Sequence, residues 1–215
     1  MNIFNIKRHR PIQGNGLDGV TRKGLVFIPD ISGFTELVRT TDLVTGRNIT
    51  KELLLTIIKN NRMNLKIAEI EGDAIFFYKW EPLPCIDGIM QQFELLKNAF
   101  DINKSELEQK YRIRLDLHLK AVAHYGDMSE FSLGGFRKLY GEVVVEAHRL
   151  LKNGIPERSY LLMTDTLTDA GSAKSNYRET LIHKHRSSKL CEIYGDVHNI
   201  CFTYVYFDKP LRITA

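Results

Sequence analysis

The pattern of apolar residues in the first hundred positions predicts a strand followed by helices. The run Leu25–Pro29 is almost wholly apolar and ends at Asp30, which is typical of a strand buried on both faces. Apolar residues then recur at spacings of three to five over 49–58, and at spacings of three and four over 86–100. Both segments are therefore predicted to be amphipathic helices.

A hairpin and a long strand are predicted around the second of these helices. Two apolar runs within 65–78 flank Glu71-Gly72-Asp73, and a glycine at this place favours a tight turn. Over 113–121 apolar and polar residues alternate strictly, so we expect a strand with one polar face.

The remaining pattern completes a mixed fold. It predicts a helix over 142–151, a strand over 159–164 and a final pair of strands over 189–195 and 200–207. The order of elements indicates an α+β or α/β chain, with one mainly antiparallel sheet and helices on one face. Residues 1–23 combine basic residues with glycines, and we expect a flexible basic extension before a domain that spans 24–215.

Composition excludes several classes of protein. The chain has 215 residues, of which 43% are hydrophobic and 26% charged, as expected of one folded domain. Thirty basic against 26 acidic residues give a net charge of +4, which suits an anionic ligand but is too small to indicate nucleic-acid binding. No apolar run is long enough to span a membrane and no secretory signal is present, so we expect a cytoplasmic protein.

The cysteines and one histidine pair give weak signals for metal binding. Cys85, Cys191 and Cys201 are odd in number and widely spaced, so we expect small buried hydrophobic residues and neither a disulfide framework nor a thiolate zinc site. His183 and His185 would share a strand face, but the basic residues around them favour a solvated stretch over a zinc pair.

Two aspartates occupy turns that suit a metal–nucleotide. Asp30 ends the first strand and leads into a glycine-containing turn, Gly33-Phe34-Thr35, at a helix start, where backbone N–H groups can donate hydrogen bonds to phosphate oxygens. Asp73 lies in the hairpin turn. If the hairpin flanks the first strand, the two carboxylates share one edge of the sheet and call for a divalent cation. Alternatively, Asp30 merely caps the helix.

These residues carry a resemblance to a known family. The segments FIPDISGFT, EIEGDAIFFY, AVAHYGD and LYGEVVVEAHRL resemble the catalytic domain of class III adenylyl and guanylyl cyclases, over roughly residues 25 to 207. The resemblance is strongest to a divergent bacterial subgroup and implies a ferredoxin-like nucleotide cyclase fold.

The resemblance implies a metal site and a reaction. Asp30 and Asp73 match the family's metal-binding aspartates, and the backbone carbonyl of Ile31 is a further ligand. In the family they hold Mg²⁺ or Mn²⁺, the ribose 3′-hydroxyl of a nucleoside triphosphate attacks the α-phosphate, and pyrophosphate leaves. Gly33, Phe34 and Thr35 then fall at the phosphates.

The base-selecting positions match Glu69 and Lys138. Family members that use GTP have glutamate at the first position, because a carboxylate accepts hydrogen bonds from guanine N1–H and N2–H. Alternatively, Glu69 is a structural acid paired with a nearby basic residue. Lys138 replaces an aspartate or a small polar residue, so the choice of base stays open. Glu71 replaces an apolar residue and is either an additional metal ligand or a solvated acid.

Other positions depart from the family. Arg149 matches the arginine that stabilises phosphate charge in the transition state, but the asparagine four residues earlier is Val145, which cannot hydrogen-bond a ribose. The family's phosphate lysine has no clear counterpart, and His198 and Lys138 are the candidates to replace it. Removing one such donor typically costs about 10²–10³ in rate. His124 falls in a part of the family that serves as scaffold.

The family places its sites between two subunits arranged head to tail, which implies a homodimer. The runs at 25–29 and 74–78 are apolar at consecutive positions, so both faces of these strands must be buried, and a partner subunit could bury one of them. Alternatively, an element of the same chain could bury that face. The leading hypothesis is thus a nucleotide cyclase-like domain. The alternatives are a catalytically inactive pseudo-cyclase that senses nucleotides or binds proteins, and a different phosphoryl transfer at the same metal pair.

Overall fold

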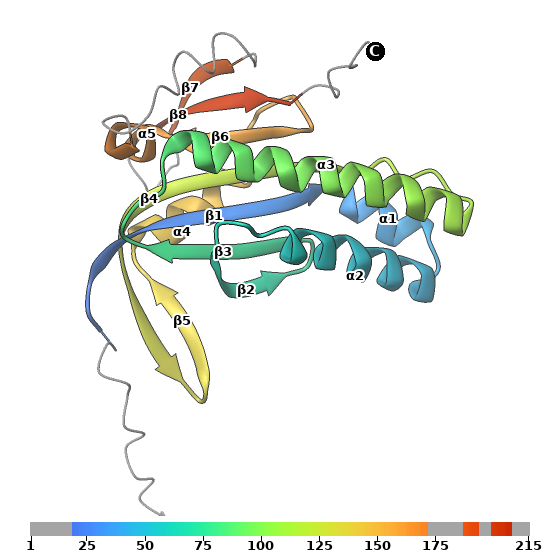
Figure 1. Cartoon of the computed structure of the whole chain (residues 1–215), viewed down its shortest axis with the longest axis horizontal. Helices are drawn as coiled ribbons and strands as arrows, with labels where there is room; N and C mark the ends of the chain where they lie inside the picture. Colours follow the sequence, from blue (N-terminus) through green and yellow to red (C-terminus); the bar gives the residue numbers. More distant parts are fainter. Residues whose placement is uncertain (1–18, 172–186, 194–198, 208–215) are drawn as a thin grey trace, which may run out of the picture.

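One sheet with helices on both faces forms the body of the protein (Figure 1). The computed structural model describes residues 19–171, 187–193 and 199–207. In chain order the elements are β1 (Arg22–Ser32), α1 (Phe34–Thr40), α2 (Leu43–Lys59), β2 (Lys66–Glu71), β3 (Ala74–Trp80), α3 (Ile86–Tyr111), β4 (His118–Leu133), β5 (Phe136–Tyr140), α4 (Glu142–Leu150), β6 (Tyr160–Thr164), α5 (Asp165–Gly171), β7 (Ser187–Ile193) and β8 (Asn199–Tyr206).

The sheet confirms the predicted α+β class and its mainly antiparallel pairing. The strand order is β2-β3-β1-β4-β6-β8-β7, and β5 pairs with β4 outside this order. Among the described strands, only β4 and β6 pair in parallel. The central strand β1 lies between β3 and β4, so that Asp30 stands opposite Ala74 on one side and Lys120 on the other.

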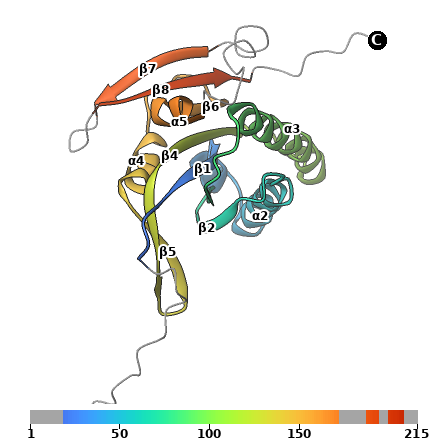
Figure 2. The same cartoon turned by 60° about the vertical axis from the view of Figure 1, so that its left-hand side comes forward.

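Alternate residues of β1 face two different cores. Leu25 and Phe27 pack in the core under α2 and α3, whereas Val26 and Ile28 pack with Val143 of α4 on the other face. Figure 2 shows α4 on one side of the sheet and α2 and α3 on the other. The expectation of helices on one face therefore holds for α2 and α3 and is corrected for α4. The physical reason is that an apolar strand needs cover on both faces, and α4 supplies part of it.

The third helix is longer than its apolar pattern predicted, and the strand after it starts later. Helix α3 continues to Tyr111 and ends at Arg112, which has the left-handed φ of 55°. Residues 113–117 are not in a strand, and β4 begins only at His118. The strict alternation over 113–121 was misleading because Leu115 and Leu117 are buried in the main core although their segment is not in a strand.

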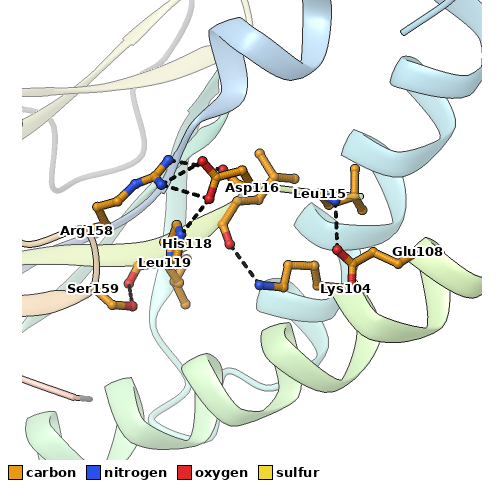
Figure 3. Close-up of polar contacts among 9 residues, drawn as sticks. Lys104, Glu108, Leu115, Asp116, His118, Leu119, Arg158 and Ser159 are labelled. Carbon is orange, nitrogen blue, oxygen red and sulfur yellow. Dashed lines mark hydrogen bonds and ion pairs between the residues drawn. The ribbon is translucent and has the colours of Figure 1, made fainter. Parts of the chain in front are cut away.

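Side-chain contacts, in place of a strand ladder, hold this segment (Figure 3). Glu108 of α3 accepts a hydrogen bond from the Leu115 N–H at 2.7 Å. The Arg158 guanidinium donates to both oxygens of Asp116, at 2.8 and 2.7 Å, and thereby ties the approach to β6 to the approach to β4. His118 contacts the same carboxylate at 3.1 Å. The other terminal nitrogen of Arg158 donates to the Asp116 backbone carbonyl at 3.3 Å, so charge-assisted hydrogen bonds fix the segment where the strand ladder is absent.

Strand β5 was not predicted from the sequence. β4 runs on to Leu133 and pairs with β5 across Gly134-Gly135, whose positive φ values of 58° and 89° fit a tight turn. Figures 1 and 2 show the resulting hairpin projecting from the body as an arm. The apolar residues of this hairpin are exposed, so no buried face imposes the alternation of apolar and polar positions that is typical of a half-buried strand. These exposed residues include Phe131, Leu133, Phe136 and Tyr140.

The prediction for the cysteines was wrong. Cys191 of β7 stands opposite Cys201 of β8 in the antiparallel register, and the two form a disulfide. Their separation of ten residues spans one hairpin, which sequence spacing did not reveal. Cys85 is a free thiol and exposed, at the N-cap of α3.

Some predicted features lie outside the described residues or at their margins. β1 begins at Arg22, and Gly19 donates a backbone hydrogen bond to the Glu130 carbonyl, so the sheet already includes the last residues of the predicted extension 1–23. Residues 1–18, the pair His183 and His185, and His198 lie outside the described residues. In the described part of the chain, we find no helix with the length and apolar character of a membrane span.

Gly33 occupies a position where the fold leaves no room for a side chain. Its φ is +91°, and a Cβ atom there would stand 2.3 Å from the Asp116 carbonyl oxygen. Gly72 also has a positive φ, of +59°, but a Cβ atom added there would have no neighbour within 4 Å.

We predict that Gly72→Ala lowers the free energy of unfolding by about 1 kcal/mol, from the left-handed backbone alone. Gly33→Ala should cost about 3 kcal/mol, because backbone must also move. Urea denaturation of both variants measures this, and equal losses would contradict the close approach.

Candidate functional site

Asp30 and Asp73 come together as the sequence predicted. Asp30 lies near the end of β1, and its side chain is 14% exposed. Asp73 occupies the turn between β2 and β3, and β3 is the neighbour of β1. The Ile31 N–H donates to the Asp73 backbone carbonyl at 3.3 Å, which ties the turn to the strand. The two carboxyl groups are close enough to share a hydrogen bond.

The charges of this pair are only partly compensated. Burial and the neighbouring Asp30 carboxylate raise the pKa of Asp73 from 3.8 to about 6. Lys120 of β4 places its ammonium 3.1 Å from Asp30 Oδ2 and donates to the Leu151 carbonyl at 3.1 Å. Sequence reasoning missed Lys120, although the alternation around it had placed it on the polar face of a strand. One lysine therefore faces two carboxylates.

The pair has the donor chemistry of a Mg²⁺ or Mn²⁺ site. Hard cations take carboxylate oxygens, and Mg²⁺ is usually held by one or two carboxylates together with substrate phosphates. Burial and the Asp30 charge both raise the pKa of Asp73, and a bound cation would oppose both effects by stabilising the ionised carboxylates. Within the described ranges there is no group of three or more His, Cys, Asp or Glu side chains fit for a metal. Backbone oxygen, from Ile31 for example, and ligand oxygen would have to complete the coordination.

The turn after β1 places three further candidate residues beside the pair. Gly33 caps α1, and its carbonyl accepts the N–H groups of Glu36 and Leu37 at 3.1 and 3.2 Å. Phe34 is half-buried and packs against the main core, whereas Thr35 is exposed. The predicted helix start is thus present, directly after the strand that carries Asp30.

Glu69 is paired within the chain. Its Oε2 accepts a short hydrogen bond from the Lys138 ammonium of β5, so the two predicted base-selecting residues meet each other. This contact also realises the alternative in which Glu69 is an acid paired with a basic residue. Both remain accessible, because half of the Lys138 side chain and about a quarter of the Glu69 side chain are exposed.

His148 is a member of this group that the sequence did not indicate. Its Nε2 lies 3.6 Å from Glu69 Oε1 and its Nδ1 lies 3.8 Å from Glu71 Oε2. Its ring packs against Phe76 of β3, with the centroids 5.0 Å apart. The histidine comes from α4 and its partners come from the β2–β3 hairpin, so only the folded arrangement brings them together.

Helix α4 also carries Arg149 and Val145. Arg149 is half-buried in the last turn of the helix, and Val145 is 50% exposed. An exposed valine supplies no hydrogen bond at the position where the cyclases have asparagine. Helix α4 therefore carries both Arg149, which matches the cyclase pattern, and Val145, which departs from it.

A buried polar contact fixes α4 on the sheet. His124 of β4 is 2% exposed, and its Nε2 lies 2.6 Å from Glu146 Oε2 of α4, while its Nδ1 lies 2.8 Å from Thr164 Oγ1 of β6. A buried polar group that lost its partner would be costly, so the contact resists rotation of the helix. His124 thus has the structural role expected of it.

Asp73→Asn tests the electrostatics of the pair. Because the folded protein binds the Asp73 proton more tightly than the unfolded chain, the ionised carboxyl costs stability above pH 6, and the cost disappears as the pH falls toward 4. Asparagine is neutral throughout. We predict that Asp73→Asn raises the free energy of unfolding at pH 7.5 in EDTA and has a much smaller effect at pH 4.5. Denaturation at both pH values measures this, with Asp127→Asn, at an exposed site, as control. Equal effects at both pH values would contradict the assignment.

Comparison with known proteins identifies the family. The family described as "Protein of unknown function (DUF2652)" matches residues 50–160. The uncharacterized protein Rv2561/Rv2562 of Mycobacterium tuberculosis is 33% identical over 126 residues, which cover 53% of this chain. The match spans 57% of that protein, little more than half of its length.

Solved structures show the fold. The adenylyl cyclase CyaB from P. aeruginosa has a TM-score of 0.62 at 17% identity, with 88% of this chain and 96% of that chain covered. The guanylate cyclase domain of RhGC from Catenaria anguillulae, solved in complex with GTP, has a TM-score of 0.59 at 15% identity, with 87% and 98% covered. The protein therefore has the fold of adenylyl and guanylyl cyclase domains, and by sequence it belongs to the DUF2652 family.

Proposed function

We propose that the protein binds a nucleoside triphosphate together with Mg²⁺ or Mn²⁺ at Asp30 and Asp73, and that it forms a 3′,5′-cyclic nucleotide with release of pyrophosphate. The observation that carries the proposal is the convergence of two carboxylates, from the end of β1 and from the β2–β3 turn, beside the ammonium of Lys120. Burial and the neighbouring Asp30 carboxylate raise the pKa of Asp73 there. The likeness to adenylyl and guanylyl cyclase domains supports it at the level of the fold.

Each residue of the site has a role in this proposal. Asp30 and Asp73 hold the metal, which supplies charge neutralisation at the phosphates and lowers the pKa of a bound hydroxyl. The turn Gly33-Phe34-Thr35 lies beside the phosphates. Lys120 contacts Asp30, and Asp73 is the carboxylate with the raised pKa, whose proton is displaced on metal binding. The reaction needs mainly positioning and charge compensation, which this arrangement of strand end and turn can supply.

Glu69 and Lys138 make guanine the first base to test. Together they present a carboxylate acceptor next to an ammonium donor. Guanine offers N1–H and N2–H to the first and O6 to the second, so its edge can satisfy both. A base would compete with the present Glu69–Lys138 contact. This competition favours a base that pairs with both partners at once.

We further propose a homodimer in which the exposed arm contacts the partner. Phe136 and Tyr140 of β5 are 75% and 73% exposed, and exposed apolar clusters of this kind mark interaction surfaces. Arg149 of one subunit would then act on phosphates held by Asp30 and Asp73 of the other. This arrangement follows the head-to-tail sites implied by the resemblance.

A pseudo-cyclase without turnover is the second candidate. Val145 lacks the polar group of the cyclase asparagine, and Glu69 already has Lys138 as its partner. Lys120 also gives Asp30 a cation that is not a metal. In this case the domain would sense nucleotides or bind a protein.

Product analysis tests turnover. We predict that the protein with Mn²⁺ and GTP yields cyclic GMP and pyrophosphate, and that Asp73→Ala lowers the rate by at least about 10³ through loss of metal positioning. ATP, CTP and UTP are run in parallel, with Asp127→Ala as the matched control, and the products are resolved by mass. Nucleotide binding without product would favour the pseudo-cyclase. Release of phosphate without a cyclic product would indicate a different phosphoryl transfer.

Mixing of variants tests the shared site. Asp73→Ala and Arg149→Ala are each expected to be inactive as homodimers. Subunit exchange should create mixed dimers in which one of the two sites is intact, and restore about a quarter of the wild-type activity. Two residues of one subunit that form a single site would show no such recovery. That outcome would refute the interfacial arrangement without touching the metal assignment.

A further inference from the structure

An apolar cavity lies on the helix side of the sheet, away from the face that carries Glu69 and α4. It has a volume of about 480 Å³ and is bounded by α1, α2 and the end of β2. Figure 1 shows α1 beside α2 at one end of the sheet, with β2 next to α2. The cavity lies inside the range of about 300–1,000 Å³ that is usual for small-molecule sites. Its apolar lining consists mainly of Phe34, Val38, Leu43, Leu54, Leu55, Ile58 and Ile70.

Several of these side chains are exposed to an extent that is unusual for their size. Leu43 is 87% exposed, Val38 57% and Ile70 49%, and all three come from different elements. Single exposed apolar residues are common, but a group that surrounds one cavity indicates a binding site. A ligand that covered them would gain by the removal of apolar surface from water.

The rim of the cavity is basic. Arg47 and Lys51 of α2 are both exposed and stand four residues apart, so they lie on the same side of the helix. Asp42 is the one acid of the lining, and its carboxylate accepts the N–H groups of Val44 and Thr45 at 3.0 Å as the N-cap of the same helix. An apolar cavity with two cations at its edge is complementary to a molecule with an apolar body and an anionic head.

We propose that this cavity binds a single-chain amphiphile with an anionic head, of the class of medium- and long-chain fatty acids. The chain lies between α1, α2 and Ile70, and the carboxylate faces Arg47 and Lys51. Phe34 follows Asp30 by four residues and Ile70 precedes Asp73 by three, so the occupant touches the two segments that hold the aspartate pair. Binding requires no nucleotide, metal or turnover.

Titration calorimetry with a homologous series tests the apolar part. The full-length protein is titrated with hexanoate, octanoate and decanoate below their micelle concentrations. Each added methylene that enters the cavity should tighten Kd about fourfold. A flat series, or no heat at any chain length, would overturn the proposal.

A pair of matched variants tests the location. Val38 lines the cavity and Val44 does not, yet both are exposed residues of neighbouring helices with the same exposed fraction of 57%. Val38→Glu should weaken decanoate binding at least about tenfold, because it places a like charge in the apolar lining. Val44→Glu should leave Kd within about twofold. Equal effects of the two variants would place binding elsewhere.

The charge of the head is tested separately. The double variant Arg47→Gln, Lys51→Gln should weaken decanoate about five- to tenfold, as expected for exposed ion pairs, and leave decanol unchanged. Lys59→Gln, in the last turn of α2 and away from the cavity, is the control. An equal loss for decanol would refute the role of the cations.

Two other occupants are separate outcomes of the same experiments. If a second copy covers the cavity, sedimentation will show self-association that Val38→Glu abolishes and decanoate does not affect. If a membrane surface covers it, anionic vesicles will bind the protein while monomeric decanoate will not. Either result would overturn the proposal.

Discussion

The repulsion between Asp30 and Asp73 is the interaction on which the candidate site depends. Two carboxyl groups would separate if the chain allowed it, but the pairing of β1 with β3 and the bond from the Ile31 N–H to the Asp73 carbonyl hold them together. Burial and this repulsion together raise the pKa of Asp73. Lys120 offsets part of the charge on Asp30 and leaves the remainder to a ligand. Two carboxylates held close together by a rigid sheet, with only part of their charge compensated, favour the binding of a cation.

The rest of the fold positions what faces this pair. Alternation along β1 turns Val26 and Ile28 to the same face as Asp30, and α4 covers that face with Val143. The buried contact between His124 and Glu146 fixes the helix that presents His148 and Arg149. The β2–β3 hairpin, whose turn contains Asp73, also carries Glu69. One supersecondary element therefore contributes to both the proposed metal site and the proposed base site.

Local chemistry made much of this predictable from sequence. The strand end at Asp30 and the glycine turn at Asp73 are local signals, and their meeting follows from hairpin pairing. Lys120 and His148 were missed because their roles depend on neighbours 90 and 79 residues away, namely Asp30 and Glu69. Periodicity also misplaced the start of β4, since burial of Leu115 and Leu117 in the main core mimics a strand pattern. The disulfide between Cys191 and Cys201 depends on strand register, which spacing alone does not encode.

Thermal unfolding in the presence of Mn²⁺ and GTP tests the central claim most directly, because a ligand that binds only the folded state stabilises it by mass action, by about 2.7 kcal/mol at a hundred times its Kd. The account predicts that Mn²⁺ raises the midpoint of the wild type, that GTP raises it further only when Mn²⁺ is present, and that Asp73→Ala shows neither shift. Equal shifts in the variant and the wild type, or a GTP shift that needs no metal, would contradict the assignment of Asp30 and Asp73 as a metal–nucleotide site.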